Sequence, residues 1–262
     1  MMNKAIVIVG YDPFCDVWPI FFECLDRYWR RDQYPIYLVT NELKPELKNV
    51  TVIPTGVEKS WSEKVLTALS QIPEESIMLL LEDYLIGKQV DEQLIEDLFS
   101  TFERENMDYL RIVPIPKLKY KDKKKGLHVM REDTLYGVTL QPSIFKKSFL
   151  IALLSGKPKT IWEIEKRQKY ENDEDKLKGN FYALDYFAIY TLNGIIKGKW
   201  DRKTIKFFKK AGFPIDTSSR GKLSKKQSFK HYFTRFWMGK LSVKQALFMK
   251  KILKKFGKKF TT

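Results

Sequence analysis

The stretch Ser-Ile-Met-Leu-Leu-Leu-Glu-Asp-Tyr-Leu-Ile, residues 76–86, decides the fold that we predict for this chain. An apolar run ends there in two adjacent carboxylates, Glu82 and Asp83. A run so short and so apolar is typical of a strand buried on both faces, in a parallel sheet covered by helices. Ligands of such sheets bind beyond the carboxyl ends of the strands, where carboxylates suit a divalent cation that carries phosphate oxygens. The alternative is a solvated strand end followed by a turn.

Strands and helices alternate on both sides of this stretch. The predicted strands are residues 4–10, 35–40, 50–54 and 109–113, and the predicted helices are residues 18–30, 61–71 and 90–105. Ser60 is the expected N-cap of the helix at 61–71. The order strand, helix, strand, helix predicts an α/β sheet with crossover connections.

The second half of the chain departs from strict alternation. Residues 117–133 are rich in Lys, Asp and Glu and predict an exposed loop or a β excursion. Residues 135–141 predict a strand, and a helix is expected to follow Pro142 and to run through residues 145–154. Residues 162–170 predict a charged helix or a turn.

The composition is that of a globular protein. The chain has 262 residues, of which 44% are hydrophobic and 14% aromatic, so it can bury a full core as one large domain or as one domain with appendages. Cys15 and Cys24 are the two cysteines, which supports neither a disulfide framework nor a zinc cluster and favours a reducing cytoplasm. We expect no signal peptide before the first strand, and no later run approaches the ~18 apolar residues of a membrane span.

The positive charge is concentrated at the C-terminal end. Residues 228–262 contain 9 Lys and 1 Arg with no Asp or Glu, and so supply +10 of the formal charge of +16. The remaining charge of about +6 is ordinary for a domain of this size.

The C-terminal segment has the pattern of a basic amphipathic helix. Within residues 244–256 the apolar positions recur near helical spacing, and the lysines fall largely on other faces. Such a helix suits an anionic membrane surface, which predicts a peripheral location at the inner face of the cell membrane. Two alternatives remain: a helix packed on the catalytic domain, and the less favoured partner, nucleic acid, because basic and aromatic residues together also bind single strands.

Several segments together resemble a known family. They are Val-Ile-Val-Gly at 7–10, Tyr-Pro-Ile-Tyr-Leu-Val-Thr-Asn at 34–41, Trp-Ser-Glu-Lys at 61–64, Leu-Leu-Leu-Glu-Asp-Tyr-Leu-Ile at 79–86 and Ile-Trp-Glu-Ile-Glu at 161–165. Over about residues 4–200 the chain resembles bacterial glycosyltransferases of the GT-A fold that are encoded among capsule, lipopolysaccharide and cell-wall polysaccharide genes. The resemblance implies an α/β fold, with a GT-A-like (Rossmann-like), mostly parallel sheet and helices on both faces.

The resemblance also implies a division of the chain. Residues 1–205 would form the glycosyltransferase domain, with a nucleotide-sugar donor bound over about residues 1–115. A glycan or lipid-linked acceptor would bind over about residues 116–205. Residues 206–262 would form a basic amphipathic helical extension.

The family's metal motif is altered in this chain. That motif is usually Asp-x-Asp, whose last carboxylate binds Mg²⁺ or Mn²⁺ on the donor diphosphate, whereas the corresponding place reads Glu82-Asp83-Tyr84. By resemblance, Asp83 is the expected metal ligand, and Glu82 assists it or contacts the sugar hydroxyls. The broken spacing leaves metal dependence open, because Lys or Arg side chains can neutralise a diphosphate instead.

A transfer that inverts the sugar needs a carboxylate base for the acceptor hydroxyl and positive charge for the leaving nucleotide. In the resembling family a Trp-Glu-x-Glu segment lies beside the acceptor, which makes Glu163 the expected base and Glu165 the second candidate. The alternative is that both are surface residues opening a helix, where acidic side chains favour the positive end of the helix dipole.

Three further residues are candidates for substrate binding. Asp12, just beyond the first strand, is expected to contact the nucleotide base or ribose, or else to form a turn. Lys64 would project toward the donor diphosphate, unless it is a solvated helix lysine. Arg111 lies within an apolar strand, where a charge must be paired or lie at a site.

The remaining candidates are weaker. Asp185 and the pair Lys199-Trp200 would edge the acceptor pocket or serve the structure. His128 and His231 are isolated, and their spacing indicates neither a metal centre nor a catalytic triad.

The sequence therefore predicts a glycosyltransferase of bacterial surface polysaccharide synthesis. Two other classes of protein stay open: a degenerate transferase that only binds a glycan or a partner, and a basic nucleic-acid-binding protein.

Overall fold

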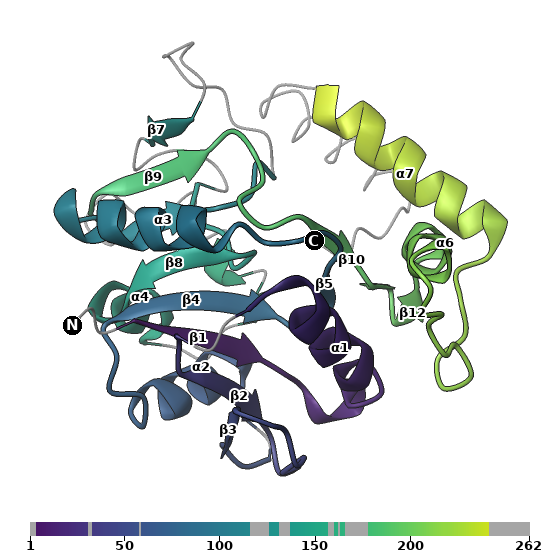
Figure 1. Ribbon diagram of the computed structural model, residues 1–262, viewed down its shortest axis with the longest axis horizontal. Helices are drawn as coiled ribbons and strands as arrows, with labels where there is room; N and C mark the ends of the chain where they lie inside the picture. The colour runs from purple at the N-terminus through teal and green to yellow at the C-terminus, as the bar shows by residue number, and fades with distance from the viewer. Residues whose placement is uncertain are drawn as a thin grey trace. The chain divides into compact units, whose positions relative to one another are not determined.

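The computed structural model of the chain describes residues 4–30, 33–57, 59–115, 126–130, 137–156, 160–161, 163–165 and 178–240 (Figure 1). Contacts between Cα atoms divide the chain into unit 1, Met1–Gly194, and unit 2, Ile195–Thr262. The division predicted at residue 205 would fall inside a helix of unit 2, α6 (Arg202–Lys210).

Unit 1 is built on an eight-stranded sheet of order β3-β2-β1-β4-β8-β6-β9-β7. The strands are β1 (Lys4–Val9), β2 (Ile36–Thr40), β3 (Thr51–Pro54), β4 (Ser76–Leu81), β6 (Tyr109–Arg111), β7 (Leu127–Val129), β8 (Ser143–Lys146) and β9 (Phe181–Leu184). Strands β1 to β4 pair in parallel, as do β6 and β9, whereas β8 and β7 are antiparallel to their neighbours. The predicted α/β fold with a mostly parallel sheet is confirmed.

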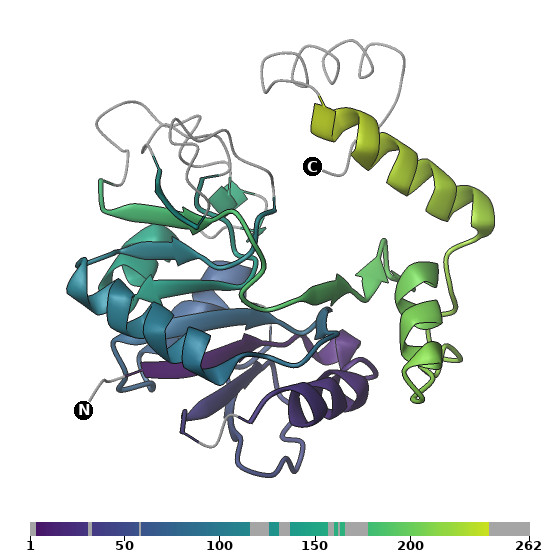
Figure 2. The same ribbon diagram turned by 45° about the horizontal axis from the view of Figure 1, so that its top comes forward.

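Helices cover both faces of this sheet, as predicted. They are α1 (Trp18–Tyr28), α2 (Trp61–Leu69), α3 (Glu92–Arg104) and α4 (Lys147–Leu154). On one face, Ala5 and Val7 of β1 share a buried apolar cluster with Val65 of α2 and Phe149 of α4. Figures 1 and 2 show α3 on the opposite face. This two-sided cover explains why β1 and β4 are apolar on both faces.

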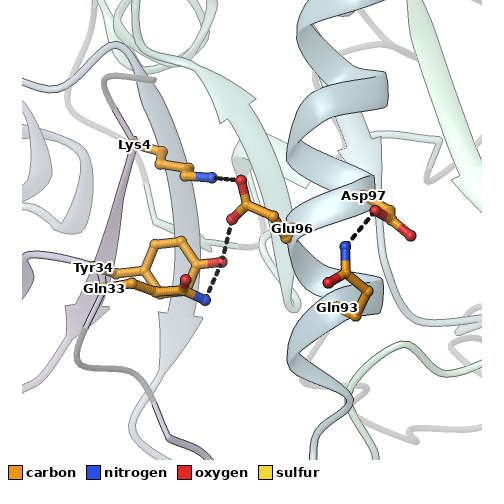
Figure 3. Close-up of polar contacts among 6 residues, drawn as sticks. All are labelled: Lys4, Gln33, Tyr34, Gln93, Glu96 and Asp97. Carbon is orange, nitrogen blue, oxygen red and sulfur yellow. Dashed lines mark hydrogen bonds and ion pairs between the residues drawn. The ribbon is translucent and has the colours of Figure 1, made fainter. Parts of the chain in front are cut away.

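A polar network attaches α3 to the amino end of β1 (Figure 3). One carboxylate oxygen of Glu96 accepts a hydrogen bond from the ammonium of Lys4, and the other accepts one from the Tyr34 hydroxyl at 3.1 Å. The Lys4 ammonium also lies 5.4 Å from the ring centroid of Tyr34 and 5.3 Å from that of Phe99. Because Lys4 begins β1, these contacts fix the edge of the sheet opposite to the carboxyl ends of the parallel strands.

The segment between residues 135 and 154 differs from the prediction. Within the described residues 137–141 there is no strand, and residues 143–146 form β8 before helix α4 begins at Lys147. Ile144 pairs with Met78 of β4 and with Leu110 of β6, so β8 fills the space between two strands. The short apolar pair Ile144-Phe145 does not distinguish a strand from the start of a helix, and tertiary pairing decides the outcome.

Residues 76–86 form two strands rather than one. β4 ends at Leu81, and Glu82 and Asp83 form a turn before β5 (Tyr84–Ile86). β5 leaves the main sheet and pairs antiparallel with β10 (Thr191–Asn193). The carbonyl of Asp83 accepts a hydrogen bond from the Gly194 N–H at 2.6 Å, which holds the turn in place.

Two predicted segments are described only in part. Of residues 117–133, the structure describes 126–130, which contain β7. Of residues 162–170 it describes 163–165, which are helical. The rest of both segments lies outside the described residues.

Unit 2 begins with the hairpin of β11 (Ile195–Ile196) and β12 (Lys199–Trp200). Its turn residues, Lys197 and Gly198, both have positive φ, as tight hairpin turns require. Helices α6 and α7 (Lys225–Lys240) follow, around a small core of Trp200, Phe208, Phe213, Ile215 and Leu223.

The helical character predicted for the basic extension is thus confirmed in the described part of unit 2. The amphipathic segment predicted at 244–256 lies outside the described residues. Among the helices that are described, none has the length and apolarity needed to cross a membrane.

Candidate functional site

The carboxyl edge of the main sheet gathers most of the predicted site residues. Strands β1, β2, β4, β6 and β9 run in the same direction and end at this edge. They are followed or ended there by Asp12, Asn41, Glu82, Arg111 and Asp185 respectively. Ligands of open α/β sheets bind at such an edge, so the topology itself brings these side chains to one side of unit 1.

Glu82 is a buried carboxylate at the centre of the edge, only 6% exposed. Its Oε2 atom accepts a hydrogen bond from the Tyr11 backbone N–H at 3.0 Å and one from the indole N–H of Trp18. Burial raises the pKa of Glu82 to about 8, although the two donors and the charge of Lys64 act in the opposite direction. Part of the Glu82 population is therefore protonated near neutral pH.

Gly10 allows β1 to end against this carboxylate. A Cβ atom at residue 10 would lie 3.1 Å from Glu82 Oε2, 3.1 Å from Leu38 Cδ1 and 3.2 Å from Trp18 Nε1. Those distances are tighter than ordinary van der Waals contact, so only glycine fits here without movement of its neighbours.

Lys64 brings a buried positive charge to the same place. Helix α2 begins with a capping box between Ser60 and Glu63, which fixes Lys64 in its first turn. The ammonium donates to the Gly10 carbonyl and, at 3.0 Å, to Asn41 Oδ1. Burial lowers the pKa of Lys64, while the carboxylates of Glu82 and Asp12 oppose that shift. Lys64 is 3% exposed and is therefore not the solvated helix lysine of the alternative.

The carboxylate of Asp12 links the loop after β1 to the loop after β2 by hydrogen bonds. Its Oδ1 accepts from the backbone N–H of Asn41 at 2.8 Å, and its Oδ2 accepts from those of Glu42 and Leu43 at 2.8 and 2.9 Å. Burial alone would raise the pKa of Asp12, but these backbone donors outweigh it and the pKa is lowered. An ionised Asp12 thus orients Asn41, which in turn holds Lys64.

Asp83 is more open than its neighbour. It is partly exposed, yet the surrounding protein removes enough water from its carboxylate to raise its pKa to about 6. Within the described residues, no group of three or more His, Cys, Asp or Glu side chains is arranged to hold a metal ion. The role of Asp83 as a metal ligand stays a prediction, in which phosphate oxygens and water would supply the other ligands, as they often do for Mg²⁺.

The sequence did not identify Tyr11, Trp18 and Asn41 as parts of this site. Tyr11 is 51% exposed, and its ring centroid lies 5.8 Å from the Lys64 ammonium. An exposed ring beside a positive charge is a surface on which a base or a sugar can stack. Tyr11 and Asn41 could have been identified by their position in the sequence, because each directly follows a predicted strand.

Glu163 and Glu165 belong to a different set of contacts. Glu163 is exposed, and its carboxylate accepts from the Thr160 N–H at 2.8 Å and from the Thr160 hydroxyl at 2.7 Å, as in a capping box. Glu165 accepts from the Leu140 N–H at 3.0 Å, and Ile164 between them joins the buried cluster below α2 and α4. These contacts fit the helix-opening alternative, and the catalytic role of Glu163 stays a prediction.

Asp185 is paired with a residue that the sequence left isolated. Its Oδ1 accepts from the Gly126 N–H at 3.0 Å, and its Oδ2 lies 3.3 Å from Nε2 of His128. The Gly126 N–H contributes most to lowering the pKa of Asp185, and His128 adds to the effect. Antiparallel pairing of β7 with β9 brings the two side chains together, which spacing along the chain does not reveal.

The remaining candidates, Arg111 and the pair Lys199-Trp200, lie in different units of the chain. Arg111 is completely buried at the end of β6, so its charge lies inside unit 1 near the carboxyl edge. Lys199 and Trp200 belong to unit 2, where Lys199 is exposed and Trp200 is part of the core.

A surface cavity of about 610 Å³ lies elsewhere, between the end of α1 and the beginning of α3. It is lined by Asp26, Arg27, Trp29, Arg30, Gln89, Val90, Asp91, Glu92 and Gln93. None of the predicted site residues lines it. We therefore place the candidate site at the carboxyl edge of the sheet, where the buried charged groups gather.

No family model matches the chain, and no curated protein matches it. Solved structures that match include S. aureus TarS 1-349 in complex with UDP, at 12% identity and a TM-score of 0.48, covering 72% of this chain and 60% of that chain. A cytidylyltransferase from Leptospira borgpetersenii serovar Hardjo-bovis matches at 14% identity and a TM-score of 0.41, covering 74% and 82%. A UDP-glucose pyrophosphorylase complexed with UDP-glucose matches at 12% identity and a TM-score of 0.40, covering 74% and 93%. The chain spans less than two thirds of the length of the TarS fragment.

Proposed function

We propose that this chain is a glycosyltransferase that moves a sugar from a nucleotide-sugar donor to a glycan or lipid-linked acceptor. The observation that carries the proposal is the cluster of Lys64, Glu82 and Asp83 at the carboxyl edge of β1, β2 and β4. Buried titratable groups with shifted pKa values at such an edge are the usual mark of a functional site. The sequence resemblance supplies the reaction class.

The donor would bind over the first half of unit 1. An ammonium has three donors, and Lys64 uses two of them within the described residues, so one remains for a diphosphate oxygen together with the positive charge. Tyr11 offers its exposed ring to the base or the ribose. Glu82 uses Oε2 inside the protein, which leaves Oε1 for a sugar hydroxyl.

Asp83 would hold a Mn²⁺ or Mg²⁺ ion if the reaction uses one. The bound cation would offset the charge that develops on the leaving diphosphate. Without it, the charge of Lys64 would serve the same purpose alone.

The acceptor would bind over about residues 116–205, where Glu163, Glu165 and Asp185 are the proposed residues. Arg111, near the end of the donor half, stays a proposed substrate-binding residue with no assigned ligand. We assign the removal of the acceptor proton to Glu163, with Glu165 as the second candidate. Its exposure leaves the carboxylate accessible to an acceptor.

The product would be a bacterial surface polysaccharide, such as a capsule or a lipopolysaccharide, made at the cytoplasmic face of the membrane. This finer assignment is supported by the sequence resemblance and by the basic C-terminal region, which suits an anionic membrane surface.

A thermal-shift screen tests the proposal directly. The chain is heated with UDP, GDP, CMP and dTDP, each with and without Mn²⁺, because a ligand that binds only the folded state raises the transition temperature. We expect one nucleotide class to raise it, and the matching nucleotide sugar to be hydrolysed or transferred. No shift with any nucleotide would contradict the donor site. If a nucleotide sugar binds but is not turned over, the degenerate transferase is favoured. If the chain binds an oligonucleotide in a salt-dependent way and does not bind liposomes, the nucleic-acid-binding alternative is favoured.

A further inference from the structure

The formal charges of the two units differ more than the charges of the two sequence regions compared above. Unit 2 contains 21 Lys and Arg but only 2 Asp and Glu, a formal charge of +19. Because the whole chain carries +16, unit 1 has a formal charge of −3. The basic character therefore belongs to unit 2 alone and begins well before residue 228.

Helix α7 of unit 2 carries an unusual exposed apolar pair. Phe229 is 71% exposed and Phe233 is 52% exposed, and the two rings stack with centroids 5.7 Å apart and an interplanar angle of 23°. Residues four apart lie on one face of a helix, so the two rings form one continuous apolar surface. Lys225, Lys226 and Lys230 are within four residues of one ring or the other.

Helix α7 is held within unit 2 at its first turn and through Tyr232. Ser224 and Gln227 cap the start of the helix, with the Ser224 N–H donating to Gln227 at 2.9 Å and the Gln227 N–H to the Ser224 hydroxyl at 3.1 Å. The Tyr232 hydroxyl donates to the buried carboxylate of Asp201, and the Lys203 ammonium lies 3.3 Å from the centroid of the Tyr232 ring. With Tyr232 held, Phe229 and Phe233 are presented outward in a defined orientation.

We propose that α7 binds an anionic lipid surface, with the stacked rings of Phe229 and Phe233 inserted at the headgroup level and Lys225, Lys226 and Lys230 against the lipid phosphates. This deepens the proposed membrane location and rests on it, but it does not require that transfer occur. Apolar rings on a helix with a basic surround are the features by which interfacial helices bind anionic lipid.

The arrangement of the rings favours lipid over nucleic acid. Proteins that bind single strands offer separate aromatic faces to successive bases. Here the two rings lie against each other with centroids 5.7 Å apart, so they form one shared apolar surface rather than two separated faces for successive bases.

Vesicle flotation of the full-length chain tests the proposal. Vesicles of phosphatidylcholine with and without phosphatidylglycerol are used at low and high salt. The double variant Phe229→Ala, Phe233→Ala should lower the partition coefficient on anionic vesicles on the order of a hundredfold, because burial of each ring is worth about tenfold or more. The triple variant Lys225→Gln, Lys226→Gln, Lys230→Gln should lower it roughly a hundredfold at low salt and much less at high salt.

Thr234→Ala is the matched control, because Thr234 is exposed on the same helix and lies outside the ring pair. It should bind vesicles as the unaltered chain does, and the far-UV circular dichroism of all variants should agree, since exposed side chains leave no cavity when shortened.

The proposal is wrong if the double Phe variant binds vesicles as tightly as the unaltered chain, or if the unaltered chain binds an oligonucleotide and no vesicle. Nucleotide-sugar turnover is measured in the same samples. Vesicle binding without turnover would contradict the proposed reaction and leave this inference standing.

Discussion

The buried ammonium of Lys64 donates a hydrogen bond to the backbone carbonyl of Gly10, and so joins the first turn of α2 to the end of β1. The same ammonium donates to Asn41 beyond the end of β2. One side chain thus connects three elements at the carboxyl edge and places a positive charge there. Its removal should affect stability and ligand binding together.

We expect Lys64→Met to weaken the binding of a nucleoside diphosphate by at least about tenfold, since a charged hydrogen bond is worth about 1.5–3 kcal/mol. The Gly10 carbonyl and the Asn41 side chain would lose their donor, which should lower the free energy of unfolding by about 1–3 kcal/mol. Calorimetry and urea unfolding measure the two effects. Lys59→Met is the control, because Lys59 is exposed on the segment before α2. Equal affinity in Lys64→Met and the unaltered chain would remove Lys64 from the donor site.

The raised pKa of Glu82 predicts how stability depends on pH. The folded state holds the Glu82 proton up to about pH 8, whereas an unfolded chain releases it near 4.5. Because the folded state binds more protons in this window, the stability contributed by protonated Glu82 is full below the unfolded value and is lost as the pH rises toward 8. Asp83, whose pKa is raised to about 6, contributes to the lower part of the same window.

The test is urea unfolding of the unaltered chain and of Glu82→Gln between about pH 6 and about pH 8. Glutamine can still accept from Tyr11 and Trp18 but does not titrate. The difference in unfolding free energy should shift in favour of the variant by up to about 1.4 kcal/mol per pH unit. A difference that does not change with pH would show that Glu82 titrates below this range.

The position of Glu82 and Asp83 could be predicted because it depends on local sequence. An apolar run that ends in charge predicts a buried strand and the residues just beyond it. The partners of Glu82 could not be predicted in this way. Tyr11 and Trp18 reach it only because β1 lies beside β4 in the sheet, and strand order is decided by packing of the whole unit.

Pairing between distant segments accounts for the other differences. The sequence predicts a helix from residue 145, but Phe145 belongs to β8, whose place between β4 and β6 decides its structure. The pair His128 and Asp185 depends on β7 and β9 in the same way. In unit 2, Asp201 and Tyr232 come from different elements that fold against each other.

We expect Asp83→Asn to lower transfer by on the order of a hundredfold or more without lowering the thermal transition, since a metal or donor ligand would be lost without a cavity. If Asp83 binds a cation, Mn²⁺ should increase nucleotide affinity in the unaltered chain and no longer do so in the variant. Asp97→Asn is the control, because Asp97 is exposed on α3 and asparagine can still accept the hydrogen bond from Gln93. Full activity in Asp83→Asn would exclude Asp83 from the site.

Glu163→Gln separates catalysis from helix capping. Glutamine fits a capping box as glutamate does, so the contacts with Thr160 and the stability should persist. A base would nevertheless be lost, and transfer should be abolished while nucleotide binding persists. Unchanged transfer would assign Glu163 to the helix start alone, and loss of donor binding would assign it to the donor site. Glu165→Gln, measured in parallel, compares the second candidate.

Tyr232→Phe should destabilise unit 2. Asp201 is 1% exposed, and among the described residues its Oδ1 has no hydrogen-bond partner, so the Tyr232 hydroxyl on Oδ2 is the donor that compensates its burial. Removal of that hydroxyl should cost about 1.5–3 kcal/mol, the range for hydrogen bonds to charged groups, while phenylalanine keeps the ring below Lys203. Urea unfolding followed by circular dichroism measures the loss. In an Asp201→Asn background the same substitution should cost about 1 kcal/mol, because a neutral acceptor makes a weaker hydrogen bond. Equal costs in both backgrounds would show that the two side chains are not energetically coupled.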